Sequence, residues 1–332
     1  MSKGSNKQRA KPAPPMKSSP ASPGWSWQVV SESVQGASHI VAELLNQDAR
    51  KVFVTRASVG ASTDWKSVTS PKFSSGSAVI AAVADGHGGQ SYIRSAKGSE
   101  IAVDVATQKL KLLMQFPPAQ LTAFHRSELE YYLATPLVRH WVDRVRAHSQ
   151  EEHFSDDQIA DFPEIQQFPE LAYGTTLLAA AANDHAVVFV QIGDGDILTV
   201  SSSREVTRPF ERDPLFIGNE TASLCSIDAD RNVKVRLKVL DDSEDDPALI
   251  LLATDGYSNC FKDDSAFAQV GTDYLDMLEK DKGRSLIENS LGGWLRQASD
   301  DYSRDDITVA MIHRAAKKLG SSKQHTRSKS ED

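Results

Sequence analysis

Short apolar runs separated by turn-forming residues occupy much of the chain, and their length and composition predict β-strands. Longer stretches with apolar residues at helical spacing predict helices. The predicted strands are Gln28–Val34, Val52–Ala57, Ser77–Ala84, Thr175–Ala182, Ala186–Ile192, Ile197–Ser201, Val233–Leu240, Ala248–Ala253 and Ile307–His313. The predicted helices are Gln90–Met114, Thr122–Ala147, Ser265–Leu278 and Gly283–Asp300.

The order of these elements limits the fold class. The segment Thr175–Ala253 holds several predicted strands with no predicted helix between them. A parallel sheet needs a crossover connection, usually a helix, between neighbouring strands, so antiparallel pairing is favoured. Because helices precede and follow this segment, the pattern predicts an α+β domain with sheets inside and helices outside.

Both ends of the chain differ in composition from this central part. Residues 1–24 are rich in Pro, Ser, Lys and Ala, and they predict a disordered basic tail. Residues 315–332 are basic, Ser-rich and aperiodic, and they predict a second disordered tail. The interpretation is one folded domain over residues 25–314. The tails either only solvate the chain or serve as docking arms or phosphorylation targets.

Charge and cysteine content narrow the function classes. The formal net charge is -8 although both tails are basic, so the predicted domain is acidic and unlike a nucleic-acid-binding face. No apolar run approaches the ~20 residues that span a bilayer, and the N-terminus lacks the apolar stretch of a secretory signal. Two cysteines, Cys225 and Cys260, suggest no disulfide framework. We expect a soluble cytoplasmic protein that binds neither nucleic acid nor membrane.

Aspartates lie at the ends of four predicted strands, namely Asp85, Asp194, Asp255 and Asp305. A single Asp-Gly is usually an ordinary turn, but four carboxylates meeting at one sheet edge would form an acidic pocket. Carboxylates that lie so close repel one another, and divalent cations resolve the repulsion. Oxygen ligands favour Mg²⁺ or Mn²⁺. The sequence has no HExxH or paired CxxC motif for zinc.

Five motifs follow one another along the chain, namely VADGHGG (Val83–Gly89), YGTTLLAA (Tyr173–Ala180), IGDGDIL (Ile192–Leu198), LLATDGYSNCF (Leu251–Phe261) and SRDDITVAMI (Ser303–Ile312). In this order they resemble the signatures of the type 2C (PPM) family of metal-dependent serine/threonine protein phosphatases, in a bacterial-like form. The resemblance covers the chain from about Trp25 to Arg314. It implies a central β-sandwich of two antiparallel sheets flanked by helices, in α-β-β-α layers.

The resemblance also implies a pair of divalent cations, Mn²⁺ or Mg²⁺, and their ligands. Asp85 is implied as the ligand shared by both cations, and Gly86 would give its backbone carbonyl to one of them. Asp255 and Asp305 are implied as ligands of the other cation. The implied reaction is hydrolysis of phosphoserine and phosphothreonine on proteins by water that the two metals activate. Phosphorylated proteins and a cognate serine/threonine kinase pathway are the implied partners.

Further residues take roles by the same resemblance. Asp194 matches an aspartate linked to a weaker third metal, and Asp48 closes the candidate first metal-binding motif. His87 is implied as the general acid that protonates the leaving alkoxide, since an ordinary histidine pKa of about 6.5 suits a donor near neutrality. An alternative is a histidine that only caps a turn. The segment Val206–Ser226 corresponds to a mobile flap beside the site.

The chain departs from the family pattern in three places. Gln47 stands where the first motif has a glutamate, and Glu43 stands where the family often has a phosphate-binding arginine. Asp306 replaces the usual asparagine after the last metal-binding aspartate, and Gly195-Asp196 replaces the Ser-Arg of GDSR. These departures concern the first motif and the third-metal region rather than the central metal pair.

Two other functions compete with this interpretation. A catalytically silent phosphatase-like domain that binds partners would explain Gln47 and Glu43. An aspartate-nucleophile phosphatase of the haloacid-dehalogenase kind would use Asp194 in a DxDx(T/V) motif. Leu198 fails to match the last position of that motif, and that fold requires a parallel sheet.

Overall fold

The computed structural model describes residues 25–54, 78–211 and 222–316. The strands are β1 (Trp25–Val34), β2 (Ala49–Val54), β3 (Val79–Ala84), β4 (Leu177–Ala182), β5 (Ala186–Ile192), β6 (Asp196–Ser201), β7 (Val206–Thr207), β8 (Lys234–Val239), β9 (Pro247–Ala253) and β10 (Ile307–Ala316). The α-helices are α1 (Ala37–Val41), α2 (Ser95–Leu113), α3 (Pro118–Leu121), α4 (Arg126–Leu129), α5 (Thr135–Glu151), α6 (Asp156–Asp161), α7 (Ala229–Asn232), α8 (Asp255–Ser258), α9 (Asp264–Glu279) and α10 (Gly283–Ala298). Four short helices of other types are η1 (Glu130–Ala134), η2 (Pro163–Gln166), η3 (Pro169–Tyr173) and η4 (Ser299–Ser303).

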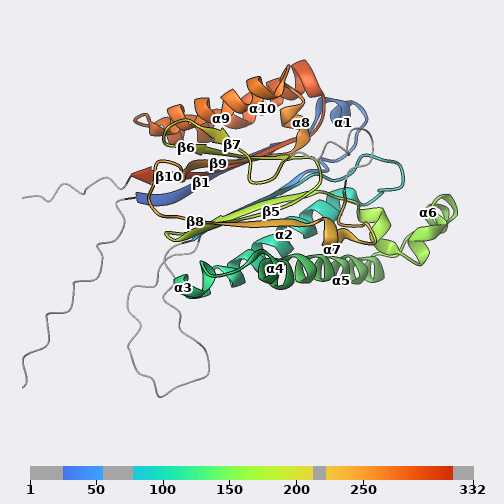
Figure 1. The fold of residues 1–332 in the computed structure, drawn as a ribbon. Helices are drawn as coiled ribbons and strands as arrows, with labels where there is room; N and C mark the ends of the chain where they lie inside the picture. Colours follow the sequence, from blue (N-terminus) through green and yellow to red (C-terminus); the bar gives the residue numbers. More distant parts are fainter. Residues whose placement is uncertain (1–24, 55–77, 212–221, 317–332) are drawn as a thin grey trace, which may run out of the picture.

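Two sheets of five strands lie face to face, and helices cover both outer faces (Figure 1). The first sheet has the order β1-β10-β9-β6-β7, and the second has the order β2-β3-β4-β5-β8. Neighbouring strands pair antiparallel throughout both sheets. The predicted α+β sandwich with α-β-β-α layers is therefore confirmed. The haloacid-dehalogenase alternative is wrong, because its fold requires a parallel sheet.

The core strand β3 shows how the layers are built. All of its residues are buried. Alternate residues from Val79 pack in the core between the two sheets, while the intervening ones, from Ile80, pack beneath the helices. Successive side chains of a strand point to opposite faces, so a strand that is covered on both faces is continuously apolar. The apolar run that ends at Ala84 therefore reflects this position between two cores.

The outer helices pack against the two sheets through their apolar faces. Helices α2 and α5 cover the second sheet, and α9 and α10 cover the first (Figure 1). Gly98 lets α2 approach η3 closely, since a Cβ there would lie 1.9 Å from the backbone oxygen of Tyr173. This contact holds the Tyr173-Gly174-Thr175 segment, which leads into β4, against the helix layer.

Two predicted elements differ from the structure. The strand predicted at Val52–Ala57 is confirmed over Val52–Val54, but its predicted start is wrong because β2 begins at Ala49; residues 55–57 lie outside the described part. This strand is at the sheet edge, where Arg50 and Lys51 can stay exposed, so the apolar run did not mark its start.

The predicted helix Thr122–Ala147 is also not continuous. It is divided into α4, the π-helical turn η1 and α5. Pro136 lies in the first turn of α5 and has no N–H to donate to the preceding turn, so the hydrogen-bond ladder is interrupted there.

The strand pairing at the chain ends fixes the extent of the sandwich. β1 pairs with β10 from Trp25 opposite Ala316 to Val34 opposite Ile307, so β10 includes the first two residues of the predicted C-terminal tail. Residues 1–24 and 317–332, where the disordered tails are predicted, lie outside the described residues. Across the described ranges, every helix is too short or too polar to span a bilayer.

Candidate metal centre

A polar pocket of about 410 Å³ lies where the ends of the two sheets meet, near α1 and α8. It is lined by residues from segments far apart in the sequence: Ser38, His39, Gln47, Asp85, Gly86, His87, Gly88, Thr176, Asp194, Asp255, Ser303 and Asp305. The structure thus brings Asp85, Asp255 and Asp305 to one pocket. Their chain segments meet because β3 belongs to one sheet, while β9 and β10 are neighbours in the other.

The Asp85-Gly86 turn is held rigidly at the end of β3. The backbone N–H of Asp85 donates to the Thr176 hydroxyl at 3.0 Å, and the backbone carbonyl of Asp85 accepts from the Thr176 N–H at 2.8 Å. Only glycine fits next, because a Cβ at residue 86 would lie 2.7 Å from the backbone oxygen of Gln47. The backbone that carries the Asp85 side chain is therefore fixed by contacts with two segments, the one that leads into β4 and the one that leads into β2.

Asp255 and Asp305 are positioned by a second close backbone contact. Asp255 is the first residue of α8, directly after β9, and Asp305 precedes β10. A Cβ at Gly256 would lie 2.1 Å from the backbone oxygen of Asp306, so glycine permits α8 to pack on the Asp305-Asp306 turn. Arg304 closes η4 with a left-handed φ of 62°, which turns the chain into this position.

Asp48 lies beneath the pocket, at the entrance to β2. It is buried, and its Oδ2 accepts a hydrogen bond from the Thr254 hydroxyl at 2.8 Å. Its Oδ1 has no hydrogen-bond partner among the described residues, and the same is true of the buried Oε1 of Gln47. Two acceptor oxygens from the first motif are therefore buried without a donor.

The carboxylates of the site disfavour one another's ionisation. Burial, and then the charges of Asp48 and Asp255, raise the pKa of Asp85 well above its ordinary value. Burial also raises the pKa of Asp48 strongly, with the Thr254 hydrogen bond acting in the opposite direction. Burial and the charge of Asp255 raise the pKa of Asp305. Positive charge placed between these carboxylates would stabilise their ionised forms.

This donor set fits hard divalent cations. The pocket offers carboxylate, amide and backbone carbonyl oxygens, which are the ligands that Mg²⁺ and Mn²⁺ take. The unpartnered oxygens of Asp48 and Gln47 and the mutual repulsion of the aspartates are both features that bound cations would relieve. Within residues 25–54, 78–211 and 222–316, however, no group of three or more His, Cys, Asp or Glu side chains is arranged so that it could hold a metal ion by itself.

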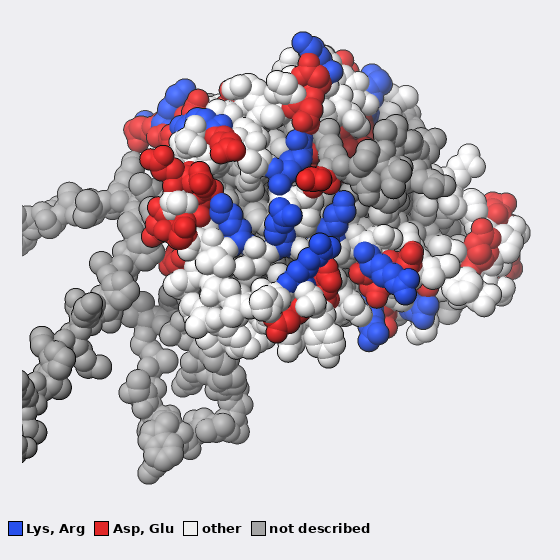
Figure 2. Space-filling model, in the orientation of Figure 1, with Lys and Arg blue, Asp and Glu red and all other residues white. Residues whose placement is uncertain are grey.

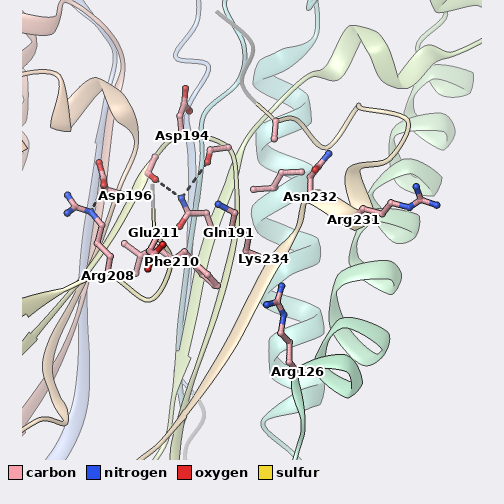
Figure 3. Close-up of a pocket in the computed structure, with 15 residues that line it drawn as sticks. Arg126, Gln191, Asp194, Asp196, Arg208, Phe210, Glu211, Arg231, Asn232 and Lys234 are labelled. Carbon is pink, nitrogen blue, oxygen red and sulfur yellow. Dashed lines mark hydrogen bonds and ion pairs between the residues drawn. The ribbon is translucent and has the colours of Figure 1, made fainter. Parts of the chain in front are cut away.

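His87 and Asp194 both line the pocket. The backbone N–H of His87 donates to the Gly174 carbonyl at 3.0 Å, and its ring lies 4.9 Å from that of Tyr92. Burial lowers the pKa of His87, and the charge of Asp255 acts in the opposite direction. Asp194 is exposed on the β5–β6 turn, and its side chain points away from the neighbouring cavity (Figure 3).

The structure gives Asp306 and His39 positions that the sequence motifs did not indicate. The buried Asp306 carboxylate accepts the backbone N–H groups of Gly36 and Gln47, both at 2.6 Å. Its Oδ2 also lies 2.9 Å from His39 Nδ1. Asp306 thus ties the β1–β2 connection to the start of β10. The only feature of the sequence that could have indicated this role is that Asp306 directly follows Asp305, and the family has asparagine at this position.

The predicted flap Val206–Ser226 is described only at its two ends. β7 pairs with β6 at its start, and residues 212–221 lie outside the described residues. Arg208, just after β7, makes ion pairs with the buried Asp196 at 3.0 Å and with Asp264 at 2.5 Å. Asp196, which replaces the arginine of GDSR, therefore anchors the beginning of this segment.

Comparisons with known proteins agree with this architecture. A sequence profile of the family "Protein phosphatase 2C" matches residues 67–296, which is more than half of the chain. A sequence search among curated proteins gave no match. A bacterial serine phosphatase of known structure is 16% identical and superposes with a TM-score of 0.50, over 89% of this chain and 100% of that one. At that identity, the similarity shows the fold.

Two further solved structures have comparable coverage. The serine/threonine phosphatase PstP/Ppp of Mycobacterium tuberculosis is 17% identical, with a TM-score of 0.48 over 86% of this chain and 98% of that one. PppA of Pseudomonas aeruginosa, described as a regulatory component of T6SS, is 16% identical, with a TM-score of 0.49 over 87% of this chain and 97% of that one.

Proposed function

The chain belongs to the protein phosphatase 2C family, and we propose that it hydrolyses phosphoserine and phosphothreonine on proteins with a pair of Mn²⁺ or Mg²⁺ ions. The observation that carries the proposal is the meeting of Asp85, Asp255 and Asp305 in one pocket, with the pKa of Asp85 and of Asp305 raised by burial and by neighbouring carboxylates. Family membership supports the reaction class, and the pocket supports the use of metal.

In this proposal the aspartates divide the ligand positions. Asp85 and the Gly86 carbonyl would hold one cation, and Asp85, Asp255 and Asp305 would hold the other. When bound, the cations supply positive charge to the phosphoryl oxygens and acidity to an attacking water. Asp48 supports the first position from below, with Gln47 contributing an uncharged oxygen. Asp194, exposed at the pocket mouth, is the proposed ligand of a weaker third cation.

His39 is proposed to replace the phosphate-binding arginine of the family. Glu43, at the expected position, is exposed and adopts a φ of 56° after α1, and it does not line the pocket. Among the described lining residues, the side chains that can carry positive charge are His39 and His87. The Asp306 Oδ2 lies 2.9 Å from the Nδ1 of the His39 ring. We expect His39→Gln to raise KM for phosphate esters more than it lowers kcat.

His87 is proposed to donate a proton to the leaving oxygen of serine or threonine. Its backbone is fixed by Gly174 and its ring lies beside Tyr92, so the imidazole is confined to the pocket. Burial lowers its pKa, while the charge of Asp255 favours the protonated ring. A proton donor at this place needs the protonated ring, which burial opposes and the charge of Asp255 favours.

The decisive experiment compares wild type with Asp255→Asn over a Mn²⁺ titration. Two substrates are used, a small aryl phosphate and a phosphoserine peptide, with Asp157→Asn as the control on the exposed face of α6. We expect metal-dependent turnover by wild type and the control, and loss of at least about 10²-fold with Asp255→Asn. Metal binding without turnover of either substrate would instead support the silent binding domain that Gln47 and Glu43 suggest.

A further inference from the structure

A second cavity, of about 380 Å³, opens beside the metal pocket. Asp194 borders both, so the two cavities are neighbours across the β5–β6 turn. The second cavity lies between this turn, α4, α7 and the edge strand β8 (Figure 3). The proposed reaction makes no use of it.

Four basic side chains line this cavity; Arg208 is paired with Asp196 and Asp264, and the other three come from three different elements. Arg126 comes from α4, Arg231 from α7 and Lys234 from the start of β8 (Figure 3). Arg126 makes one ion pair, with Glu130, but its side chain is 80% exposed. Neither Arg231 nor Lys234 makes an ion pair with any residue in the described ranges. Their charge is therefore available to a ligand.

The acidic residues of the cavity do not cancel this charge. Asp196 is buried and already paired with Arg208. The Asp194 side chain points away from the cavity (Figure 3). Glu211 remains as an acidic side chain on the lining. The lining thus carries four basic and three acidic side chains, so its net charge is positive although the whole chain carries a formal charge of -8.

The positive charge continues along β8. Figure 2 shows lysine and arginine side chains gathered over this strand on the face seen in Figure 1. Lys234, Arg236 and Lys238 alternate along it, so they share one face of the strand. Lys238 is partly engaged, since it donates to the backbone oxygen of Asp245. Arg236 lies 5.9 Å from the ring of Phe210, which also lines the cavity.

The arrangement of the cations indicates what kind of anion fits. In Figure 3 the Arg126, Arg231 and Lys234 side chains are spread around the cavity and do not converge on one point. A single phosphate needs donors that converge, whereas several carboxylates along a peptide can meet separated cations one by one. We propose that this cavity and β8 bind a carboxylate-rich segment of the substrate protein that flanks the phosphorylated residue. This inference rests on the proposed phosphatase function and names its substrate class.

The location gives such a segment a purpose in catalysis. The metal pocket is built from carboxylates, which repel an acidic substrate until cations are bound. A positive strip next to the pocket attracts acidic segments and places the phosphoresidue near the metal site, with an effect that salt weakens. A substrate without acidic residues loses this attraction but not access to the pocket.

The test uses three phosphoserine peptides of equal length with the full chain. The first has glutamates flanking the phosphoserine, the second has glutamines there, and the third has glutamines and a second phosphoserine. The enzyme variants are wild type, Arg231→Gln/Lys234→Gln, and the control Lys280→Gln/Arg296→Gln, whose exposed side chains lie just after α9 and on α10. A small aryl phosphate reports on the catalytic centre alone.

We expect wild type and the control to favour the glutamate peptide over the glutamine peptide by about fivefold in kcat/KM, through KM, at low salt. The Arg231→Gln/Lys234→Gln variant should lose this preference and keep its aryl phosphate turnover. Equal turnover of all peptides by wild type would overturn the inference while leaving the phosphatase function intact. A preference for only the doubly phosphorylated peptide would show a single-phosphate subsite instead and would also overturn it.

Binding provides an answer that does not depend on turnover. Fluorescence anisotropy of the labelled glutamate peptide is measured with the same variants. Tighter binding by wild type than by Arg231→Gln/Lys234→Gln, with the control unchanged, supports the docking site even if no substrate is hydrolysed. Identical binding by all three contradicts it. Absence of aryl phosphate turnover would count against the proposed function alone.

Discussion

Two adjoining regions of the sandwich are built on opposite principles. Between the sheets, β3, β4, β9 and β10 contribute apolar side chains that are almost fully buried. One residue beyond β3, Asp85 opens a pocket in which buried carboxylates raise one another's pKa values. The apolar core between the two sheets, called the seam below, stabilises the fold, whereas the repulsion between the carboxylates of the pocket destabilises it. A stable seam is therefore what allows the edge of the same sheets to hold charges that repel one another.

The largest effect is expected from the centre of the pocket. Asp85→Asn removes the carboxylate proposed to be shared by both cations, and kcat/KM for an aryl phosphate should fall by about 10³-fold. The same change removes a repelling charge, so in EDTA the variant should unfold at the same or a higher temperature than wild type. Retained turnover, or a large loss of stability in EDTA, would contradict this contrast between the two regions.

A change in the seam should have the reverse pattern. Phe189 on β5 is 2% exposed and packs between the sheets. Phe189→Ala should lower the free energy of unfolding by about 3–4 kcal/mol, measured by urea denaturation, because it leaves a cavity. The folded fraction should keep its metal affinity. Phe168→Ala, at a side chain that is 46% exposed, is the control and should cost less than about 1 kcal/mol.

Asp306 connects the two regions and should show an intermediate effect. Asp306→Ala leaves the buried N–H groups of Gly36 and Gln47 without their acceptor and should lower the free energy of unfolding by about 2–3 kcal/mol. Asp306→Asn keeps one carbonyl acceptor and should recover part of this loss. Equal stability of all three proteins in chemical denaturation would show that the carboxylate is not the clamp that the geometry indicates.

The pocket should make the stability of the metal-free protein depend on pH. The pKa of Asp48 is raised in the folded state, mainly by burial, so the folded chain holds its proton more tightly than the unfolded chain. The associated stability is present below the unfolded pKa, near 4, and is lost as pH rises through the raised folded pKa. In EDTA, the free energy of unfolding should therefore fall as the pH rises above about 4. Asp48→Asn should flatten this dependence.

The smallest effect is expected at Gln47. Its buried Oε1 has no hydrogen-bond partner among the described residues and lies on the pocket lining. Gln47→Glu would restore the charge that the family has there and should tighten apparent Mn²⁺ affinity by about three- to tenfold. Mn²⁺ titration of aryl phosphate turnover measures the change. The control is Gln35→Glu, because Gln35 does not line the pocket. An unchanged affinity in both variants would place Gln47 outside the metal site.

The amino-acid sequence by itself determined the strands, the aspartates at their ends and the family. Apolar runs and Asp-Gly turns are local features, and local backbone preferences follow directly from them. It was less successful where context overrides them, as in the edge strand β2, whose charged residues stay exposed, and at η1, where Pro136 interrupts a helix.

Only the tertiary structure decided which of these residues act together. The Asp306 clamp joins a loop and a strand more than two hundred residues apart, and the basic cavity assembles Arg126, Arg231 and Lys234 from α4, α7 and β8. Neither grouping can be recognised from a spacing pattern in the sequence. The distance between such groups is set by the packing of the two sheets and their helices and not by the length of chain between them.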